Sequence, residues 1–324
     1  MKVIDMHCDT ITELWGKQEN GIQVGLRHND QMIDIERLTK GGYVLQNFAI
    51  FVEQQSGVSS FEKAQQIRSV FAREMNQNAD RIAMVTSVKG IEENEQAGKV
   101  SALLTVEGGE ACEGSIEKLH VLYEQGVRMM TLTWNYPNEI GYPNLPIGAA
   151  GFPYVPDTEH GLTSFGIQCV EEMEKMGMII DVSHLSDAGV DDVLRYTKKP
   201  FVASHSNARA ICPWVRNLTD DMIREMVRRN CLIGLNYCKS FITDGGIGDS
   251  PDDLYRHIEH FFSLGAYENI ALVSDFDGAA LPTYLNTPAK AADLYEYFLE
   301  KGMAKELAEG IMFRNAEEFF RKNL

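Results

Sequence analysis

The chain has 324 residues, of which 44% are hydrophobic and 24% charged, a composition typical of a globular protein with a full-sized core. Thirty basic residues against 47 acidic ones give a formal net charge of −17, which argues against nucleic acid and anionic membrane surfaces as partners. No stretch approaches the roughly 20 apolar residues of a membrane-spanning helix. The length allows roughly two domains, but it also suits one α/β barrel.

The ends of the chain and its cysteines favour a cytoplasmic protein. Residues 1–7 lead directly into a predicted strand, without the apolar run and cleavage site of a signal peptide. The charged residues 317–324 do not resemble a lipid-anchor signal. The six cysteines are scattered without paired spacing, which predicts free thiols in a reducing compartment.

Short apolar runs alternate along the chain with stretches of helical periodicity. The predicted strands are Val3–His7, Val44–Val52, Ser101–Glu107, Val127–Trp134, Met178–His184, Phe201–Ser206, Cys231–Tyr237 and Asn269–Asp275. Most are almost continuously apolar, as parallel strands covered on both faces are. The predicted helices are Phe61–Asn78, Ser115–Gln125, Thr163–Lys175, Ser186–Thr197, Thr219–Arg229, Asp252–Leu264 and Pro288–Lys301.

This alternation predicts one (β/α)8 TIM barrel over residues 1–324, of the kind that metal-dependent amidohydrolases use. The alternative, an open doubly wound sheet, normally uses fewer strands, and no G-x-G-x-x-G motif follows the first strand. Three long loops, Asn135–Gly161, Cys238–Pro251 and Phe276–Thr287, follow strands. We expect them at the carboxyl-terminal face of the barrel, where active sites are built.

Polar residues stand at the carboxyl ends of five predicted strands. They are His7, Asp9, Glu107, His184, His205 and Asp275. Because these ends meet at one mouth, three histidines and two carboxylates suffice for two divalent ions that share a carboxylate. Taken singly, each residue is more readily a hydrogen-bonded residue of the core or of a loop. Asp5 and Asp181 are equally open to that interpretation.

Six motifs in a fixed order span nearly the whole chain. They are His7-Cys8-Asp9, Val106-Glu107-Gly108-Gly109, Asp181-Val182-Ser183-His184-Leu185-Ser186, Ser204-His205-Ser206-Asn207-Ala208, Arg216-Asn217-Leu218-Thr219-Asp220-Asp221 and Ser274-Asp275-Phe276-Asp277-Gly278. Singly they are weak signals, but the ordered set is specific. It resembles the renal (membrane) dipeptidase family of zinc peptidases, peptidase family M19, in a soluble, bacterial-type form.

The resemblance implies two zinc ions per chain that share Glu107. His7 and Asp9 complete the ligands of one ion, whereas His184 and His205 complete those of the other. A hydroxide that bridges the two ions is then expected to attack the peptide carbonyl.

The resemblance also assigns the groups that handle the substrate. Arg216 resembles the arginine that grips the substrate's C-terminal carboxylate, and Asp275 the carboxylate that moves a proton during hydrolysis. From the residues alone, a helix cap or a surface ion pair is the favoured interpretation of Arg216.

One position departs from the family pattern. Well-studied members carry a histidine in the loop after strand four, where this chain has Trp134 followed by Asn135. An indole N–H donates a hydrogen bond but does not exchange a proton near neutral pH. We therefore expect Trp134 to shape the substrate pocket or Asn135 to supply the polar contact, with a rim aromatic as the alternative for Trp134.

The resemblance thus implies a zinc-dependent dipeptidase that acts on dipeptides with a free C-terminal carboxylate, including those with a D-residue at that position. The oligomeric state stays open, with a homodimer as one possibility. Two other functions stay open as well. One is an amidohydrolase acting on N-acyl amino acids or cyclic amides, and the other is a silent barrel that binds metal or peptide.

Overall fold

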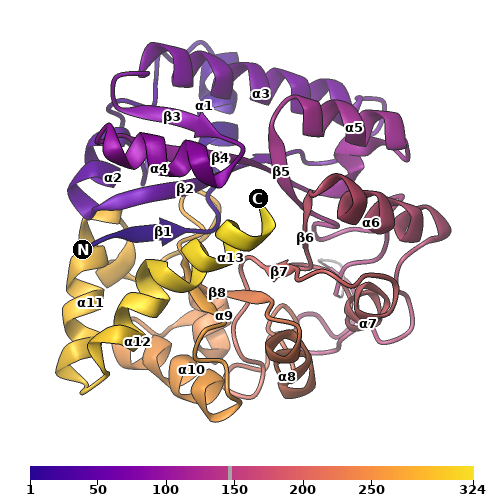
Figure 1. Cartoon of the computed structure of the whole chain (residues 1–324). Coiled ribbons are helices and arrows are strands. Elements are labelled where there is room, and N and C mark those ends of the chain that lie inside the picture. The colour runs from indigo at the N-terminus through magenta and orange to yellow at the C-terminus, as the bar shows by residue number, and fades with distance from the viewer. Residues whose placement is uncertain (145–147) are drawn as a thin grey trace.

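Within the residues that the computed structural model describes, 1–144 and 148–324, eight parallel strands form a closed barrel (Figure 1). The barrel order is β2–β1–β9–β8–β7–β6–β5–β4, and β4 pairs back with β2. The strands are β1 (Val3–Asp5), β2 (Tyr43–Phe51), β3 (Ile82–Val85), β4 (Val100–Glu107), β5 (Val127–Thr131), β6 (Ile179–Asp181), β7 (Val202–Ala203), β8 (Leu232–Asn236) and β9 (Ile270–Val273). The predicted (β/α)8 architecture is confirmed.

Strand β3 lies outside the barrel and was not among the predicted strands. It pairs with residues 100–103 of β4, and β5 takes over the same edge from Leu104 onward. Its apolar run of four residues is too short for periodicity to separate it from a loop or a helix.

Several strands end earlier than predicted. Glu107 is the last residue of β4, but His7, His205 and Asp275 lie two residues beyond their strands and His184 lies three residues beyond. The backbone adopts left-handed φ angles of 70° at His184 and 59° at Asp275, which cannot continue a β-ladder. The metal-type residues therefore sit on short kinked segments just above the barrel.

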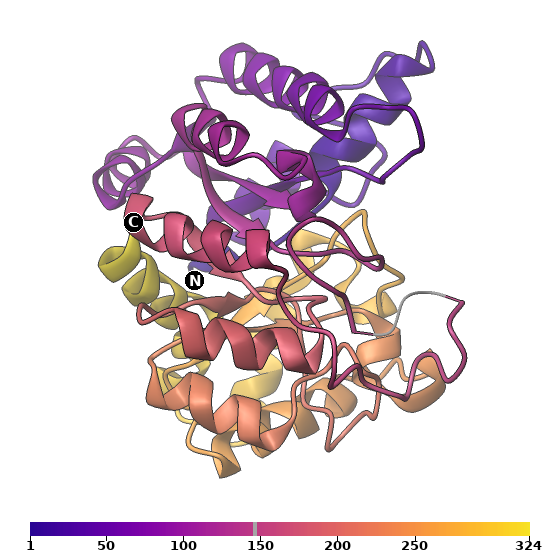
Figure 2. The same ribbon diagram turned by 90° about the vertical axis from the view of Figure 1, so that its right-hand side faces the viewer.

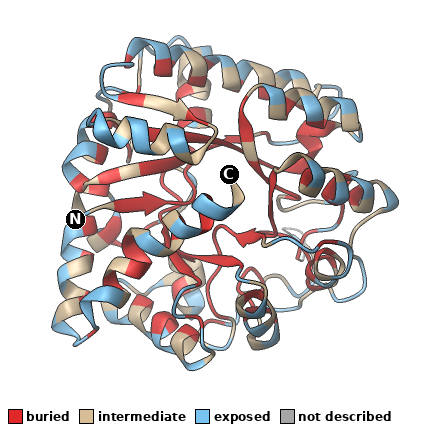
Figure 3. Ribbon diagram, viewed as in Figure 1, coloured by how far each residue is buried: buried red, intermediate tan, exposed pale blue. Residues whose placement is uncertain are grey.

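Helices cover the outside of the barrel, with buried inner faces and exposed outer faces (Figure 3). They are α1 (Thr10–Glu19), α2 (Ile35–Gly41), α3 (Ser60–Gln77), α4 (Val88–Gln96), α5 (Ile116–Glu124), α6 (Ser164–Met176), α7 (Asp187–Tyr196), α8 (Asp220–Arg228), α9 (Lys239–Ile242), α10 (Pro251–Ser263), α11 (Ala291–Glu300), α12 (Lys305–Glu309) and α13 (Asn315–Asn323). The seven predicted helices are α3, α5, α6, α7, α8, α10 and α11. The other six helices of the described residues were not predicted, and two of them, α9 and α12, have only four and five residues, too few for periodicity to reveal.

The two ends of the barrel are finished differently. Helix α13 lies across the amino-terminal end (Figure 1), where Phe319 and Phe320 pack against buried strand residues such as Leu45 and Leu232. The described parts of the long loop, residues 135–144 and 148–161, lie at the other end, away from the chain termini (Figure 2). Residues 145–147 of that predicted loop fall outside the described residues. The core is thus sealed at one end and leaves the other for a site.

Two sequence expectations about the chain as a whole can be compared with the structure. All six cysteines lie within the described residues and none of them forms a disulfide. In the part of the chain that the structure describes, we find no helix that is long and apolar enough to span a membrane.

Candidate metal centre and active site

The predicted metal-type residues meet at the carboxyl-terminal mouth of the barrel, and Glu107 lies between the histidines. Its oxygen Oε2 is 3.4 Å from His7 Nε2. Its other oxygen, Oε1, is 3.0 Å from His184 Nε2 and 3.5 Å from His205 Nε2. One carboxylate therefore turns its two oxygens toward two different sets of imidazoles, as a bridging ligand does.

Asp9 and Asp275 lie on the His7 side of this cluster. Asp9 Oδ2 is 3.4 Å from His7 Nε2. Ligand-type atoms of His7, Asp9 and Asp275 all lie within 4.8 Å of one another, and so do those of His7, Glu107 and His205. The structure thus brings together all six predicted residues, and it adds Asp275 to the His7 group.

Burial and charge in the cluster suit a divalent cation. His7 Nε2 and Asp9 Oδ1 are buried and have no hydrogen-bond partner among the described residues. Burial, reinforced by the nearby charge of Glu107, raises the pKa of Asp9 to about 7. Burial and the positive charge of Arg216 hold the pKa of His184 well below its ordinary value, so its imidazole is neutral. The neutral imidazole of His184 and the crowded buried carboxylates belong to a histidine–carboxylate donor set of the kind that fits zinc.

Two pairs of neighbouring strand ends carry most of these residues. The β9–β1 corner consists of residues 5–9 and 272–276, and it holds His7, Asp9 and Asp275. The β6–β7 corner consists of residues 181–184 and 202–205, and it holds His184 and His205. Glu107, at the end of β4, faces both corners.

Main-chain hydrogen bonds place His7 in the β9–β1 corner. The carbonyl oxygen of His7 accepts from the amide of Asp275 at 3.2 Å and from the Ser274 hydroxyl at 3.3 Å. Asp5 Oδ1 accepts from the amides of His7 at 3.3 Å and Ser274 at 2.9 Å. The imidazole Nδ1 of His7 has no partner in the described part of the chain.

Side-chain hydrogen bonds orient both imidazoles of the β6–β7 corner. Ser204 Oγ lies 2.7 Å from His205 Nδ1 and donates to Asp181 Oδ2 at 2.5 Å. Since the hydroxyl proton goes to the carboxylate, the hydroxyl accepts from His205 Nδ1–H. His184 Nδ1 is likewise 2.8 Å from Asn135 Oδ1. Both Nε2 atoms are thereby left with a lone pair that faces Glu107.

Arg216 lies buried beside the metal-type cluster rather than at the surface. It helps to line a cavity of about 410 Å³ together with Glu107, His184, His205 and Asp275. The residue is only 6% exposed, and its Nε and Nη2 atoms have no partner among the described residues. Burial lowers its pKa to about 10, so the guanidinium remains charged. The alternative of a surface ion pair or a helix cap is wrong, because this buried cation has donors free for an anion.

Trp134 and Asn135 both line the cavity. The Trp134 ring packs on Phe51 with centroids 4.9 Å apart and meets the edge of Tyr136 at 5.5 Å. Trp134 therefore forms an aromatic wall. The amide oxygen of Asn135 is engaged by His184, so Asn135 supports an imidazole as well as lining the cavity.

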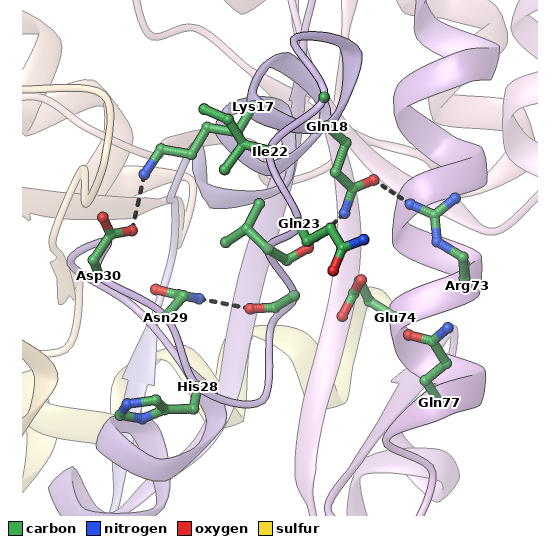
Figure 4. A pocket seen from close by; sticks show the side chains of 13 residues that line it. Lys17, Gln18, Ile22, Gln23, His28, Asn29, Asp30, Arg73, Glu74 and Gln77 are labelled. Carbon is green, nitrogen blue, oxygen red and sulfur yellow. Dashed lines mark hydrogen bonds and ion pairs between the residues drawn. The ribbon is translucent and has the colours of Figure 1, made fainter.

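A larger hollow of about 1110 Å³ lies between α1, α3 and residues 20–34 (Figure 4). Several of its polar groups are bonded to one another. Lys17 pairs with Asp30 at 3.0 Å, and the backbone amide of Leu26 donates to Glu74 Oε2 at 2.7 Å. These contacts hold residues 20–34 against α1 and α3. The hollow is lined by none of the predicted site residues, so the candidate site is the cavity at the barrel mouth.

The sequence left Asp181 open as a hydrogen-bonded residue of the barrel, but it did not single out Ser204 or Asn236 as supports of the site. Asp181 and Ser204 carry His205, and Asn236 Nδ2 donates to Asp275 Oδ2 at 3.1 Å. The available signal was a polar residue next to a metal-type residue at the end of an apolar run, as in Ser204-His205. That signal does not reveal the hydrogen-bond partner, which lies on another strand.

Comparison with known proteins agrees with this site. Residues 1–322 match the family model for membrane dipeptidase, peptidase family M19. An uncharacterized Klebsiella pneumoniae protein, encoded in the pqqA 5' region, is 32% identical over 242 residues, which is 74% of this chain and 88% of that protein.

Solved structures give the same result. The dipeptidase AC, a metallo peptidase of family M19, is 25% identical, with a TM-score of 0.92 over 100% of this chain and 98% of its own. A metallo peptidase from Rhodobacter sphaeroides, liganded with a phosphinate mimic of the dipeptide L-Ala-D-Ala, shares the fold with a TM-score of 0.91 at 24% identity, over 100% of this chain and 99% of its own. The chain belongs to the membrane dipeptidase family, peptidase family M19.

Proposed function

We propose that this chain is a zinc-dependent dipeptidase that hydrolyses dipeptides with a free C-terminal carboxylate. The observation that carries the proposal is Arg216, a buried cation with unpartnered donors in the same cavity as the carboxylate–histidine cluster. A guanidinium binds a carboxylate through paired hydrogen bonds. The proposed setting is the cytoplasm, which six unpaired cysteines support.

The cluster has the residues for two zinc ions. His7, Asp9 and Glu107 would hold one ion, and Glu107, His184 and His205 would hold the other. The two-sided contacts of Glu107 support this division. When bound, the ions supply an activated water and polarise the peptide carbonyl.

Asp275 handles the proton in this proposal. Its Oδ2 is held by Asn236 at 3.1 Å, which leaves Oδ1 to accept the proton of the attacking water and to return it to the leaving amine. Arg216 orients the substrate through its terminal carboxylate. Trp134 bounds the space beside the scissile bond and excludes water from it.

The direct test compares a dipeptide, its amide and the tripeptide of the same residues, with L-Ala-D-Ala beside L-Ala-L-Ala, on zinc-reconstituted enzyme. Wild type should prefer the dipeptides. Arg216→Ala should lower kcat/KM for the dipeptide, because a charge-assisted contact is lost. The expected loss of transition-state stabilisation is about 1.5–3 kcal/mol, and kcat/KM for the dipeptide amide should change little. The exposed Arg224→Ala on α8 is the matched control. Equal kcat/KM for all substrates, or indifference to Arg216→Ala, contradicts the proposal.

A second candidate, hydrolysis of N-acyl amino acids, is favoured by the same arginine, since such substrates also carry a free carboxylate. They lack the amino-terminal ammonium, however. N-acetylalanine in the panel separates the two functions, and turnover of N-acetylalanine above that of the dipeptides would replace the first proposal with the second.

A further inference from the structure

Three asparagines are buried beneath the active-site cavity without lining it. Asn207, Asn217 and Asn236 are at most 1% exposed. They lie after β7, before α8 and at the end of β8, on three separate segments of the chain. A buried amide is costly unless it is hydrogen-bonded, so the use of each of these amides needs an explanation.

Asn207 joins the other two. The backbone N–H of Asn207 donates to Asn217 Oδ1 at 2.9 Å. Its side chain forms a two-way contact with the main chain of Asn236, accepting from the amide at 2.8 Å and donating to the carbonyl oxygen at 2.9 Å. The three residues therefore make one rigid unit, which we call the asparagine bridge.

One end of the asparagine bridge holds Asp275. The Nδ2 of Asn236 donates to Asp275 Oδ2 at 3.1 Å, and its Oδ1 accepts from the amide of Cys238 at 2.6 Å. Among the described residues, Asn236 donates the only hydrogen bond that the Asp275 carboxylate accepts. The contact with Asn236 is therefore a principal constraint on the direction of the Asp275 carboxylate.

The other end of the asparagine bridge holds the platform of Arg216. The Nδ2 of Asn217 donates at 2.9 Å to the carbonyl oxygen of Phe241 and at 2.9 Å to that of Cys212. The Phe241 ring lies under the Arg216 guanidinium, with Cζ 5.2 Å from the ring centroid. Asn217 also follows Arg216 directly in the chain, so this end fixes the cation through both its backbone and its stacking partner.

We propose that the asparagine bridge is a spacer that sets the separation between the Arg216 guanidinium and the Asp275 carboxylate and thereby selects substrates of dipeptide length. The inference rests on the proposed function, because it assumes that the two groups address the terminal carboxylate and the scissile bond. A fully satisfied buried network is stiff, and misplacement of a reacting group by about 1 Å is enough to lower rates strongly. Asn207, Asn217 and Asn236 are positioning residues in this scheme.

The two ends of the bridge predict different kinetic effects. Asn217→Ala loosens the Arg216 platform, so dipeptide KM should rise about tenfold or more and the dipeptide-to-tripeptide preference should fall by a similar factor, with kcat changed by less than about threefold. Asn236→Ser loses the donor to Asp275, so kcat should fall about tenfold or more while KM stays within about threefold. A merely structural role does not split KM and kcat in this way.

Asn269→Ala is the matched control. Asn269 is also a buried asparagine next to the β8–β9 pair, which carries Asn236 and Asp275 at its other end. Its Nδ2 donates to the carbonyl oxygen of Cys231 at the amino-terminal end of these strands, away from the barrel mouth. We expect it to lower stability and leave kcat, KM and length preference unchanged. If Asn217→Ala fails to fold, Phe241→Leu removes the same aromatic platform from a half-buried position on α9 and should raise KM in the same way.

The outcomes separate this inference from the proposed function. One outcome is that wild type hydrolyses dipeptides while the Asn217 and Asn236 variants show parallel changes in KM and kcat, or keep the dipeptide-to-tripeptide preference. Either result contradicts the spacer proposal and leaves the proposed dipeptidase function in place. If wild type shows no dipeptide turnover with zinc, both fall. Asn236→Ser in the Asp275→Asn background should cost no further activity, and an additional tenfold loss there would show that Asn236 does not act through Asp275.

Discussion

In the β9–β1 corner the hydrogen bonds reach the main chain of His7, whereas in the β6–β7 corner they reach the imidazoles of His184 and His205. Each corner also contains a buried aspartate that accepts hydrogen bonds at its base, Asp5 in one and Asp181 in the other, but the two accept different numbers of them. Asp5 accepts two backbone amides on Oδ1, and its Oδ2 has no partner among the described residues. Asp181 accepts two amides on Oδ1 and two hydroxyls on Oδ2.

The difference shows which property each corner has to secure. An imidazole whose Nδ1 is hydrogen-bonded has a fixed tautomer and ring angle, and the β6–β7 corner secures both. The β9–β1 corner fixes the position of His7 but leaves its Nδ1 without a partner among the described residues, so its ring angle depends on contacts with Asp9 and Glu107. We therefore expect the β6–β7 corner to be more rigid before metal binds.

The largest effect is expected at Glu107, the residue that faces both corners. Glu107→Ala should leave the protein unable to hold two ions and should abolish turnover, because each proposed ion loses an anionic ligand. Elemental analysis of purified variant and wild type measures this. Two tightly held ions in the variant would show that the corners bind metal independently of Glu107.

The proposed proton-transfer residue, Asp275, belongs to the β9–β1 corner, and the β6–β7 corner has no counterpart in the proposal. Asp275→Asn should retain the metals and lower kcat by about 10²–10⁴, because the amide has the same shape but does not accept a proton. Asp277→Asn is the control, since the Asp277 carboxylate is occupied by the Thr10 hydroxyl at 2.6 Å and the Met32 amide at 2.8 Å. A larger loss of kcat in the control than in Asp275→Asn would move the proton-transfer role to Asp277.

Removal of the two aspartates should affect stability unequally. Asp181→Ala strands four buried donors and should lower the free energy of unfolding by roughly 3–5 kcal/mol, whereas Asp5→Ala strands two and should lower it by about 1–3 kcal/mol. Urea unfolding of both metal-free variants measures the difference. Equal losses would mean that the extra hydroxyl contacts of Asp181 add nothing.

The carboxylate of Asp5, which accepts hydrogen bonds on one oxygen, predicts that stability depends on pH. Burial raises the pKa of Asp5 from 3.8 to about 6, so between these values the unfolded chain has lost a proton that the folded chain keeps. Stability should therefore fall as pH rises through this window, by up to about 3 kcal/mol above pH 6, and Asp5→Asn should not show that part of the decline.

Denaturant unfolding of wild type and Asp5→Asn at several pH values between about 4 and 7 tests this expectation. The exposed Asp30→Asn serves as the control. Parallel pH profiles for wild type and Asp5→Asn would show that the Asp5 carboxyl is already ionised at the lower end of the window.

The smallest predicted effect concerns the imidazole supports. Asn135→Ala frees the His184 Nδ1 and should weaken zinc binding by about 10- to 100-fold, with little change in the free energy of unfolding of the metal-free protein. Competition with a chelator measures the affinity. An unchanged affinity would mean that the His184 ring is held by Glu107 and by packing on Trp134 alone.

Most of the architecture was predictable because it is encoded locally. The apolar runs and intervening helices predicted the eight barrel strands, and capping hydroxyls such as Ser186 and Thr219 mark helix starts as expected. The short elements β3, α9 and α12 were missed because four or five residues carry too little periodicity, and α1, α2, α4 and α13 were not predicted either. The predicted site residues do gather, but their roles as ligands stay a prediction.

The sequence by itself therefore determined the barrel and the set of side chains at its mouth, since the position of a polar residue after an apolar run is a local property. Only the tertiary structure decided how those side chains are used. The two faces of Glu107, the burial of Arg216 and the link from Asn217 to Asp275 all join segments far apart in the chain. Such contacts depend on how the strands close around one another, which no local pattern records.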